Sequence, residues 1–156
     1  MQILSESVNQ TLNIGRKLSP ILKAGDILCL FGGLGSGKTV LVKGIASGLG
    51  IKKSEVLSPT FILIRQYRFA ALSLNHFDLY RLKSEKDILG LGYEDYFFGC
   101  GITVVEWADR LRNLMPKEYL GIELSVKGKK HRLIKMNPCG RRYKELINGL
   151  NENIRS

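Results

Sequence analysis

Long hydrophobic segments are missing from this sequence. A membrane-spanning helix needs about 20 consecutive apolar residues, whereas the longest apolar stretch, Ile27–Phe31, has only the length of a buried strand. The opening residues, MQILSESVNQ, also lack the basic start, long apolar middle and small-residue cleavage site of a secretory signal. We therefore expect a protein without a membrane segment, located in the cytoplasm.

Cysteine is scarce as well. Cys29, Cys100 and Cys139 are odd in number and far apart, and no C-x-x-C pair occurs, so neither a disulfide framework nor a zinc site is indicated. We expect reduced thiols with structural roles. Hydrophobic residues make up 44% and charged residues 24% of the 156 residues, which excludes disorder as the main state and predicts a single domain over residues 1–156.

Acidic residues are too few to balance the basic ones. The 14 Asp and Glu stand against 24 Lys and Arg, a formal net charge of +10. Most of the excess lies in residues 127–144, which include no acid. Such a segment is typical of a surface that contacts nucleic acid or an acidic partner, and equally of a solvated hairpin and helix, and the sequence leaves both interpretations open. Its basic residues are Lys127, Lys129, Lys130, Arg132, Lys135, Arg141, Arg142 and Lys144.

The hydrophobic pattern predicts an α/β protein. The continuous apolar run at 26–31, bounded by Gly25 and Gly32, is typical of a strand buried on both faces. Apolar positions at helical spacing predict helices on either side of it, over 5–18 and 39–49. The remaining pattern predicts a β-hairpin over 61–80, a short helix after Ser84, another helical turn in LGLGYEDYFFG, a strand over 102–105, a second hairpin over 120–126 and 132–136, and a final helix over 141–150.

The turn of the first hairpin has an unusual composition. Its residues, RFAAL, include neither the glycine nor the asparagine that a two-residue turn prefers. We therefore expect a connection longer than two residues near Ala70 and Ala71.

Residues 32–39, GGLGSGKT, match the phosphate-binding pattern G-x-x-x-x-G-K-[ST] between a predicted strand and a predicted helix. The glycines allow successive backbone N–H groups to point at phosphate oxygens, and the helix presents its positive dipole end. We expect Lys38 to reach the β and γ phosphates and the Thr39 hydroxyl to ligate Mg²⁺. The expected nucleotide-binding residues of this loop are Gly32, Gly33, Leu34, Gly35, Ser36, Gly37, Lys38, Thr39 and Val40.

Two carboxylates are candidates for catalysis beside Lys38. Glu106 ends the apolar run ITVVE, where a buried strand would deliver a Walker B acid to the phosphate end of the sheet. In HFDLY, strand alternation places Asp78 on one face with His76 and Tyr80. The ordinary alternatives are a strand-end ion pair for Glu106 and a half-exposed strand residue for Asp78.

A GTPase motif is present only in part. Residues 87–90, DILG, match D-x-x-G, but KSEK precedes them instead of an apolar strand, so Asp87 is predicted to begin a helix. No N/T-K-x-D guanine-recognition motif occurs. These observations favour ATP over GTP.

Four motifs occur in order along the chain: FGGLGSGKT, SPTF at 58–61, HFDLYR at 76–81 and VEWADRL at 105–111. Together, over about residues 5–142, they resemble the TsaE family of bacterial P-loop ATPases in tRNA threonylcarbamoyladenosine biosynthesis. The resemblance implies a P-loop NTPase-like three-layer fold, with a mixed parallel and antiparallel central sheet flanked by helices. It also implies bound ATP or ADP with Mg²⁺ and slow intrinsic hydrolysis.

The resemblance further implies an accessory role and specific site residues. The partners would be a TsaD-like catalytic subunit and a TsaB-like subunit, whose repeated turnover this ATPase would support without transferring the threonylcarbamoyl group itself. Glu106 and Asp78 would be metal-shell or water-orienting acids, in an order that the sequence leaves open. Thr60 would be a switch threonine or would only start a strand, and Trp107 would lie near the nucleotide or pack in the core. His76 would support Asp78, line a partner surface or be purely structural.

Two other functions remain as alternatives. The first is a P-loop small-molecule or nucleoside kinase, which would need an acceptor pocket and an arginine-rich lid that residues 82–101 do not display. The second is a nucleic-acid-binding module in which residues 127–144 do the work and the nucleotide is regulatory.

Overall fold

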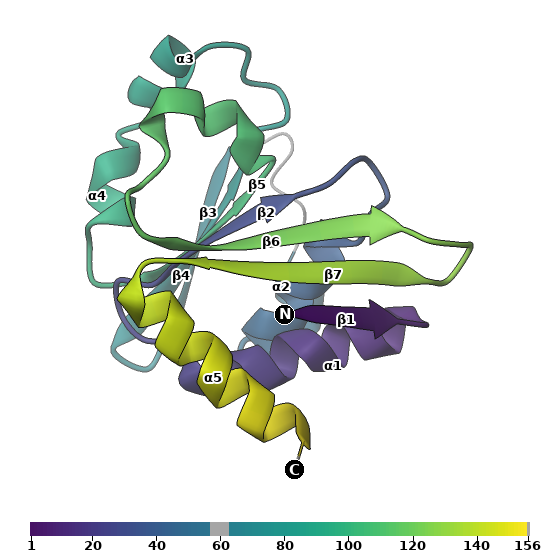
Figure 1. Ribbon diagram of the computed structural model, residues 1–156. Helices are drawn as coiled ribbons and strands as arrows, with labels where there is room; N and C mark the ends of the chain where they lie inside the picture. Colours follow the sequence, from purple (N-terminus) through teal and green to yellow (C-terminus); the bar gives the residue numbers. More distant parts are fainter. Residues whose placement is uncertain (57–62, 156) are drawn as a thin grey trace.

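A mixed β-sheet forms the centre of the computed structural model, which describes residues 1–56 and 63–155 (Figure 1). In this part of the chain seven strands follow the order β1-β7-β6-β2-β5-β4-β3. The neighbours β6, β2, β5 and β4 pair in parallel, and β1, β7 and β3 pair antiparallel with their neighbours. The strands are β1 Gln2–Ser5, β2 Ile27–Phe31, β3 Ile64–Phe69, β4 Leu72–Asp78, β5 Ile102–Glu106, β6 Tyr119–Val126 and β7 Arg132–Cys139.

Helices cover both faces of the sheet, giving three layers (Figure 1). The helices α1, α2 and α5 pack on one face, where Leu41 and Leu146 join the larger apolar core. The helices α3 and α4, with a 3₁₀ segment at Ala108–Leu114, cover the other face around Phe77 and Phe97. Their bounds are α1 Val8–Leu18, α2 Lys38–Gly48, α3 Glu85–Leu89, α4 Tyr93–Phe97 and α5 Arg141–Arg155.

Two glycines allow α1 and α2 to pack with their backbones in contact. A Cβ on Gly15 would lie 2.7 Å from the carbonyl oxygen of Leu41, and a Cβ on Gly44 would collide with the backbone of Leu12. Ser19 adds to this contact, because its hydroxyl donates to the carbonyl oxygens of both helices. This packing fixes α2, and therefore the glycine-rich loop before it, against the sheet.

The central parallel strands aim their carboxyl ends at one edge. The strands β2 and β5 are apolar runs buried on both faces, as their composition predicts. The loop at 32–37 follows β2, while Glu106 and Asp78 are the last residues of β5 and β4. Ligands of open α/β sheets bind at this edge, so the topology places the predicted site residues together.

Most predicted elements are confirmed, and two expectations at helix and turn positions are wrong. The helix expected over 5–18 begins at Val8, because Ser7 caps it by accepting a hydrogen bond from the N–H of Gln10, and residues 2–5 form the short edge strand β1. The first hairpin turns in only two residues. Ala70 adopts a φ of 48° there, a left-handed conformation that glycine adopts more easily than alanine. The regular pairing of β3 with β4 holds the alanine in this conformation.

Asp87 lies within α3, whose N-cap Ser84 accepts a hydrogen bond from the N–H of Asp87, as the non-GTPase interpretation of DILG predicts. Within the described ranges, no helix is both long and apolar enough to span a membrane.

Candidate nucleotide site

The glycine-rich loop has a backbone that only glycine adopts easily. Gly32, Gly35 and Gly37 have φ angles of 149°, 73° and 101°. Side chains are excluded sterically as well, because a Cβ on Gly32 would lie 2.5 Å from the carbonyl oxygen of Leu124. The helix α2 then begins at Lys38, and the N–H groups of its first turn have no partner within the helix. Loop and helix together form a cradle suited to an anion.

Lys38 lies across this loop and is only 5% exposed. Its Nζ donates to the carbonyl oxygens of Gly32 and Gly33 at 2.6 and 2.8 Å. The same atom lies 4.1 Å from the ring centroid of Trp107, a cation–π contact. Burial lowers the pKa of Lys38, and the negative charges of Glu106, Asp78 and Asp109 oppose that shift. The ammonium group is therefore poorly solvated, held by backbone oxygens that an anion can replace.

Glu106 joins three elements of the fold. Its Oε1 accepts a hydrogen bond from the hydroxyl of Thr39 at 2.8 Å, and its Oε2 lies 2.5 Å from Nε2 of His76. Glu106 is 2% exposed and His76 is 0% exposed. The carboxylate is thus oriented by α2 on one side and β4 on the other.

Asp78 is the second carboxylate at this edge. The β4–β5 register pairs it with Glu106, and it is 3% exposed, unlike the half-exposed strand residue considered as an alternative. Its Oδ1 accepts a hydrogen bond from the N–H of Tyr80 at 2.9 Å. Tyr80 lies in the turn after β4, not on the strand as expected, and its ring contacts Trp107 at a centroid distance of 4.8 Å.

A cavity of about 300 Å³ lies between these groups. Gly32 and Gly33 line the adjoining depression on the β6 side of the loop. Thr60, the expected switch threonine, lies outside the described residues. The cavity is lined by Leu34, Gly35, Ser36, Gly37, Lys38, Thr39, Val40, Asp78, Tyr80, Glu106 and Trp107.

Some contributions to this site escape the sequence patterns. His76 contacts Glu106, and this diagonal contact between the parallel strands β4 and β5 depends on their register. Asp109 adds negative charge near Lys38 from the 3₁₀ segment. In the sequence, the feature that could have pointed to Asp109 is its position three residues after Glu106 in VEWADRL. Trp107 has a φ of 57°, a strained conformation for a bulky residue directly beside the site.

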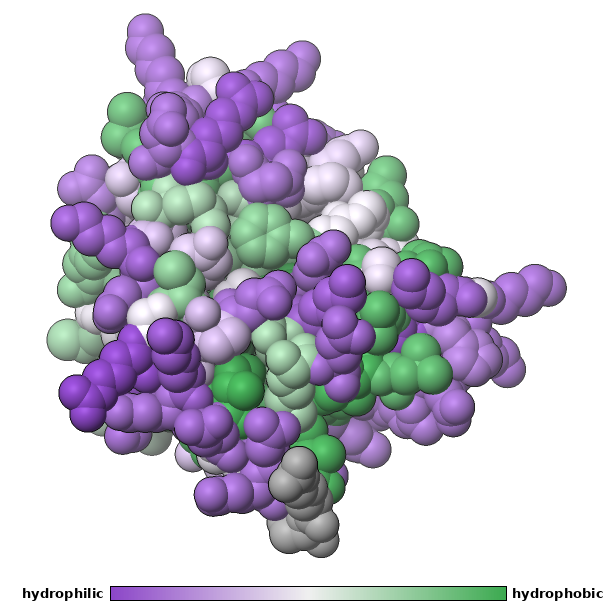
Figure 2. Space-filling model, in the orientation of Figure 1, coloured by the Kyte–Doolittle hydropathy of each residue, from purple (hydrophilic) through white to green (hydrophobic). Residues whose placement is uncertain are grey.

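The basic segment at 127–144 does not form one surface. The strand β7 has eight residues, so at about 3.3 Å per residue its two ends lie about 25 Å apart. The hairpin tip between β6 and β7 is covered by hydrophilic side chains at the right of the molecule (Figure 2). At this end Arg132 donates to the carbonyl oxygen of Gly35 in the glycine-rich loop at 3.1 Å. The start of α5 lies at the other end.

A groove of about 370 Å³ connects the hairpin tip with the glycine-rich loop. It shares Gly35, Gly37 and Val40 with the first cavity. Its other walls come from the start of α1 and from the hairpin, through Ser7, Val8, Asn9, Thr11, Lys129, Lys130 and Arg132.

Arg142 serves the fold at the far end of the sheet. Its guanidinium donates through Nε and Nη2 to the two carboxylate oxygens of Asp26, at 2.9 and 2.6 Å, and also to the carbonyl oxygen of Ile21. The hydrogen bonds to Asp26 raise the pKa of Arg142. Beside it the phenol oxygen of Tyr143 accepts from the N–H of Ile27, and burial raises the pKa of Tyr143 to about 12. These contacts fasten α5 to the start of β2.

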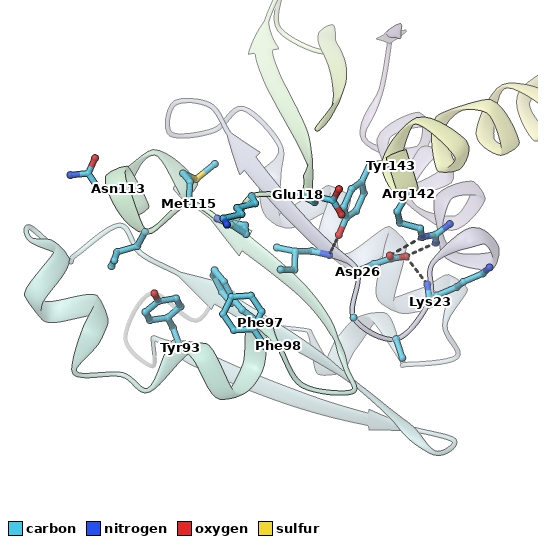
Figure 3. A pocket seen from close by; sticks show the side chains of 16 residues that line it. Lys23, Asp26, Tyr93, Phe97, Phe98, Asn113, Met115, Glu118, Arg142 and Tyr143 are labelled. Atoms are coloured by element: carbon cyan, nitrogen blue, oxygen red, sulfur yellow. Dashed lines mark hydrogen bonds and ion pairs between the residues drawn. The ribbon is translucent and has the colours of Figure 1, made fainter. Parts of the chain in front are cut away.

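The same contacts form one wall of a cavity of about 790 Å³. In Figure 3 the rings of Tyr93 and Phe97 face it from α4, opposite the ion pair of Asp26 with Arg142. This cavity shares no lining residue with the cavity around Lys38. It lies at the amino end of β2, opposite the edge where the phosphate loop lies.

The strand, glycine-rich loop and helix, with two buried acids on neighbouring strands, define an α/β protein with a P-loop NTPase-like fold. The family model described as "Threonylcarbamoyl adenosine biosynthesis protein TsaE" matches residues 5–134. The chain belongs to the TsaE family, which confirms the resemblance noted in its motifs.

Individual relatives agree with this assignment. The tRNA threonylcarbamoyladenosine biosynthesis protein TsaE of Bacillus subtilis is 40% identical over 141 residues, covering 90% of this chain and 87% of the relative. The protein of the same name from Treponema pallidum is 38% identical over 126 residues, covering 81% and 92%. The crystal structure of Bacillus subtilis YdiB superposes with a TM-score of 0.84 at 32% identity, covering 99% of this chain and 95% of that one. The mixed three-layer fold is therefore confirmed.

Proposed function

We propose that this protein binds and hydrolyses ATP as an accessory protein in the biosynthesis of threonylcarbamoyladenosine in tRNA. The observation that carries the proposal is the convergence of Lys38, Thr39 and two buried acids, Asp78 and Glu106, on one cavity. The names of the relatives support the pathway. A tRNA-modifying protein of this kind would work in the cytoplasm.

The cavity beside Lys38 and the groove that adjoins it suit the phosphate chain and the nucleoside of a nucleotide, respectively. The cavity beside Lys38 has the cationic and backbone donors that a phosphate chain needs. The groove on the other side of Gly37 is framed by the start of α1 and by Arg132, and it offers room for a nucleoside. ATP or ADP would then span the loop, with the phosphates toward Glu106.

The oxygen atoms at this edge fit Mg²⁺. This ion prefers oxygen ligands and is held by one or two carboxylates together with substrate phosphates. The hydroxyl of Thr39 and the carboxylate of Glu106 are donors of this kind, and we propose that they hold it, with the carboxylate of Asp78 beside them. When bound, Mg²⁺ would neutralise charge that develops on the transferred phosphoryl group. The contact between Thr39 and Glu106 favours Glu106 for the metal side.

The chain's own residues then have separate tasks. Lys38 exchanges its hydrogen bonds to Gly32 and Gly33 for bonds to phosphate oxygens, where its poorly solvated charge is most effective. With Glu106 on the metal side, Asp78, in register with it at the end of β4, is the acid that accepts a hydrogen bond from the attacking water and orients it. Trp107 and Tyr80 close one side of the cavity against solvent.

The expected partners are a TsaD-like catalytic subunit and a TsaB-like subunit. Of the basic segment, the hairpin tip with Lys129 and Lys130 is the part suited to contact tRNA or a partner near the nucleotide, because Arg142 is used in the fold. The alternative of a kinase is disfavoured. Residues 82–101 form α3 and α4, which pack on the sheet through Ile88 and Phe97, whereas a kinase lid would close over the phosphate loop.

The test is phosphate release from ATP by the protein alone and with the two synthase subunits. We expect a low rate that rises when both subunits are present, and loss of that rate in Lys38→Ala. A rate that is indifferent to the subunits, or that requires a small acceptor molecule, would support the kinase instead. A tRNA-binding module would show tRNA affinity that falls steeply with salt.

A further inference from the structure

His76 is completely buried on β4, and its one polar contact within the described part of the chain is with Glu106. Its neighbours on the strand, Leu74 and Phe77, belong to the two apolar cores. An imidazole at such a position brings a polar group into the interior, which costs free energy unless the group is hydrogen-bonded. The single contact is therefore the feature of His76 that needs an explanation.

The hydrogen-bond pattern assigns the donor. Nδ1 of His76 is buried and has no hydrogen-bond partner among the described residues. A ring with its proton on Nε2 leaves only a lone pair at Nδ1, whereas a proton on Nδ1 would leave a buried N–H unpaired. The Nε2–H group of His76 therefore donates to Oε2 of Glu106.

Glu106 then has one donor on each carboxylate oxygen. Thr39 binds Oε1 from α2, and His76 binds Oε2 from β4. The side chain of a glutamate has several rotatable bonds, and two donors from different elements hold its carboxylate in one orientation. Asp78, although in register with Glu106, has a separate hydrogen bond to the N–H of Tyr80.

We infer that His76 is a positioning residue, which holds the carboxylate of Glu106 toward Thr39 and so sets the Mg²⁺ dependence of nucleotide binding. The inference rests on the proposed function. His76 is absent from the lining of the nucleotide cavity, so it acts through Glu106. Substituting a residue that hydrogen-bonds to a metal-binding carboxylate typically lowers metal affinity or activity by about 10- to 100-fold.

Two amide substitutions separate positioning from simple space filling. The side-chain nitrogen of glutamine reaches the place of Nε2, whereas that of asparagine reaches only the place of Nδ1. His76→Gln therefore keeps a donor for Glu106, and His76→Asn keeps a buried amide without that donor. If His76 only fills space, the two variants will behave alike.

The readout is the fluorescence of Trp107, the only tryptophan, whose ring contacts Lys38. ADP is bound first in EDTA, and Mg²⁺ is then titrated at a fixed ADP concentration. We expect all variants to bind ADP alike in EDTA. We expect His76→Asn to need about 10- to 100-fold more Mg²⁺ and His76→Gln to stay within about threefold of the unmodified protein.

Asn75 provides the matched control on the same strand. It is 2% exposed, and its side chain bonds to Gln66 and Thr103, away from Glu106. Asn75→Ala should lower stability without moving the Mg²⁺ titration. If His76→Asn needs no more Mg²⁺ than the unmodified protein, or if Asn75→Ala raises the Mg²⁺ requirement as much as His76→Asn does, the inference about His76 is overturned and the proposed function is unaffected. If the unmodified protein binds no ADP, the proposed function is overturned with it.

Discussion

The hydroxyl of Thr39 donates a hydrogen bond of 2.8 Å to Oε1 of Glu106, which joins the first turn of α2 to the last residue of β5. These residues are far apart in sequence, and each follows or ends one of two adjacent parallel strands. The contact brings the oxygen ligand expected from the phosphate loop next to the expected acid. The predictions below test this edge of the sheet and the packing that holds it.

Glu106→Gln tests the role of the acid. The amide keeps the shape of the side chain but removes its charge. If its NH₂ group lies against the Nε2–H group of His76, two donors face each other and the hydrogen bond is lost. Because the amide is a poorer Mg²⁺ ligand than the carboxylate, we expect hydrolysis to fall by about 100-fold or more, with ATP binding in EDTA retained. Phosphate release and ATP binding are measured on the same sample. Unchanged hydrolysis would exclude Glu106 from the reaction, and loss of ATP binding in EDTA would indicate a structural role.

Gly44, at the contact between α1 and α2, and Gly149, in α5, should respond to alanine in opposite ways. A Cβ on Gly44 would collide with the backbone of Leu12, so Gly44→Ala should lower the free energy of unfolding by about 1–3 kcal/mol. Gly149 lies within α5, where a Cβ would have ordinary contact with Ile21 at 3.8 Å, so Gly149→Ala should raise it by about 0.5–1 kcal/mol. Urea unfolding measures both. Equal effects would show that the helix contact is not tight.

Adjacent arginines at the start of α5 should differ in importance. Arg142→Ala leaves the buried Asp26 without its ion pair and should cost about 2 kcal/mol of stability. The Arg141 side chain is 91% exposed and forms an exposed ion pair with Glu145, so Arg141→Ala should change stability little. Thermal or urea unfolding distinguishes them. A small effect of Arg142→Ala on stability would show that its contact with Asp26 is not essential to the fold, and Arg142 would again be a candidate for contact with tRNA.

Tyr143 should make stability depend on alkaline pH. Burial raises its pKa from 10.0 to about 12 in the folded protein, so above pH 10 the unfolded chain loses the phenol proton first. The stabilisation is complete below pH 10 and is lost as the pH rises to about 12. Tyr143→Phe should flatten this part of the curve of unfolding free energy against pH. An unchanged slope would assign the dependence to Cys29, whose pKa burial also raises to about 12.

Local patterns were sufficient for much of the fold. The buried runs of β2 and β5, the helix after the phosphate loop and the cap at Ser84 follow from apolar periodicity and capping chemistry, which act over a few residues. The edge strand β1 was missed because its four residues carry no periodicity and it forms by pairing with β7. The tight turn at Ala70 was missed because strand pairing outweighs the preference of the turn for glycine.

The sequence by itself predicted a phosphate-binding loop at 32–39, which includes Lys38 and Thr39, and identified Asp78 and Glu106 as candidate acids beside it, because strand ends and glycine spacing are local features. Only the tertiary structure decided that His76 contacts Glu106. It also decided that the two ends of the basic segment lie apart, with Arg132 at the phosphate loop and Arg142 paired with Asp26. Such relationships depend on strand order and register, which arise when distant segments pack together and which no short stretch of sequence specifies.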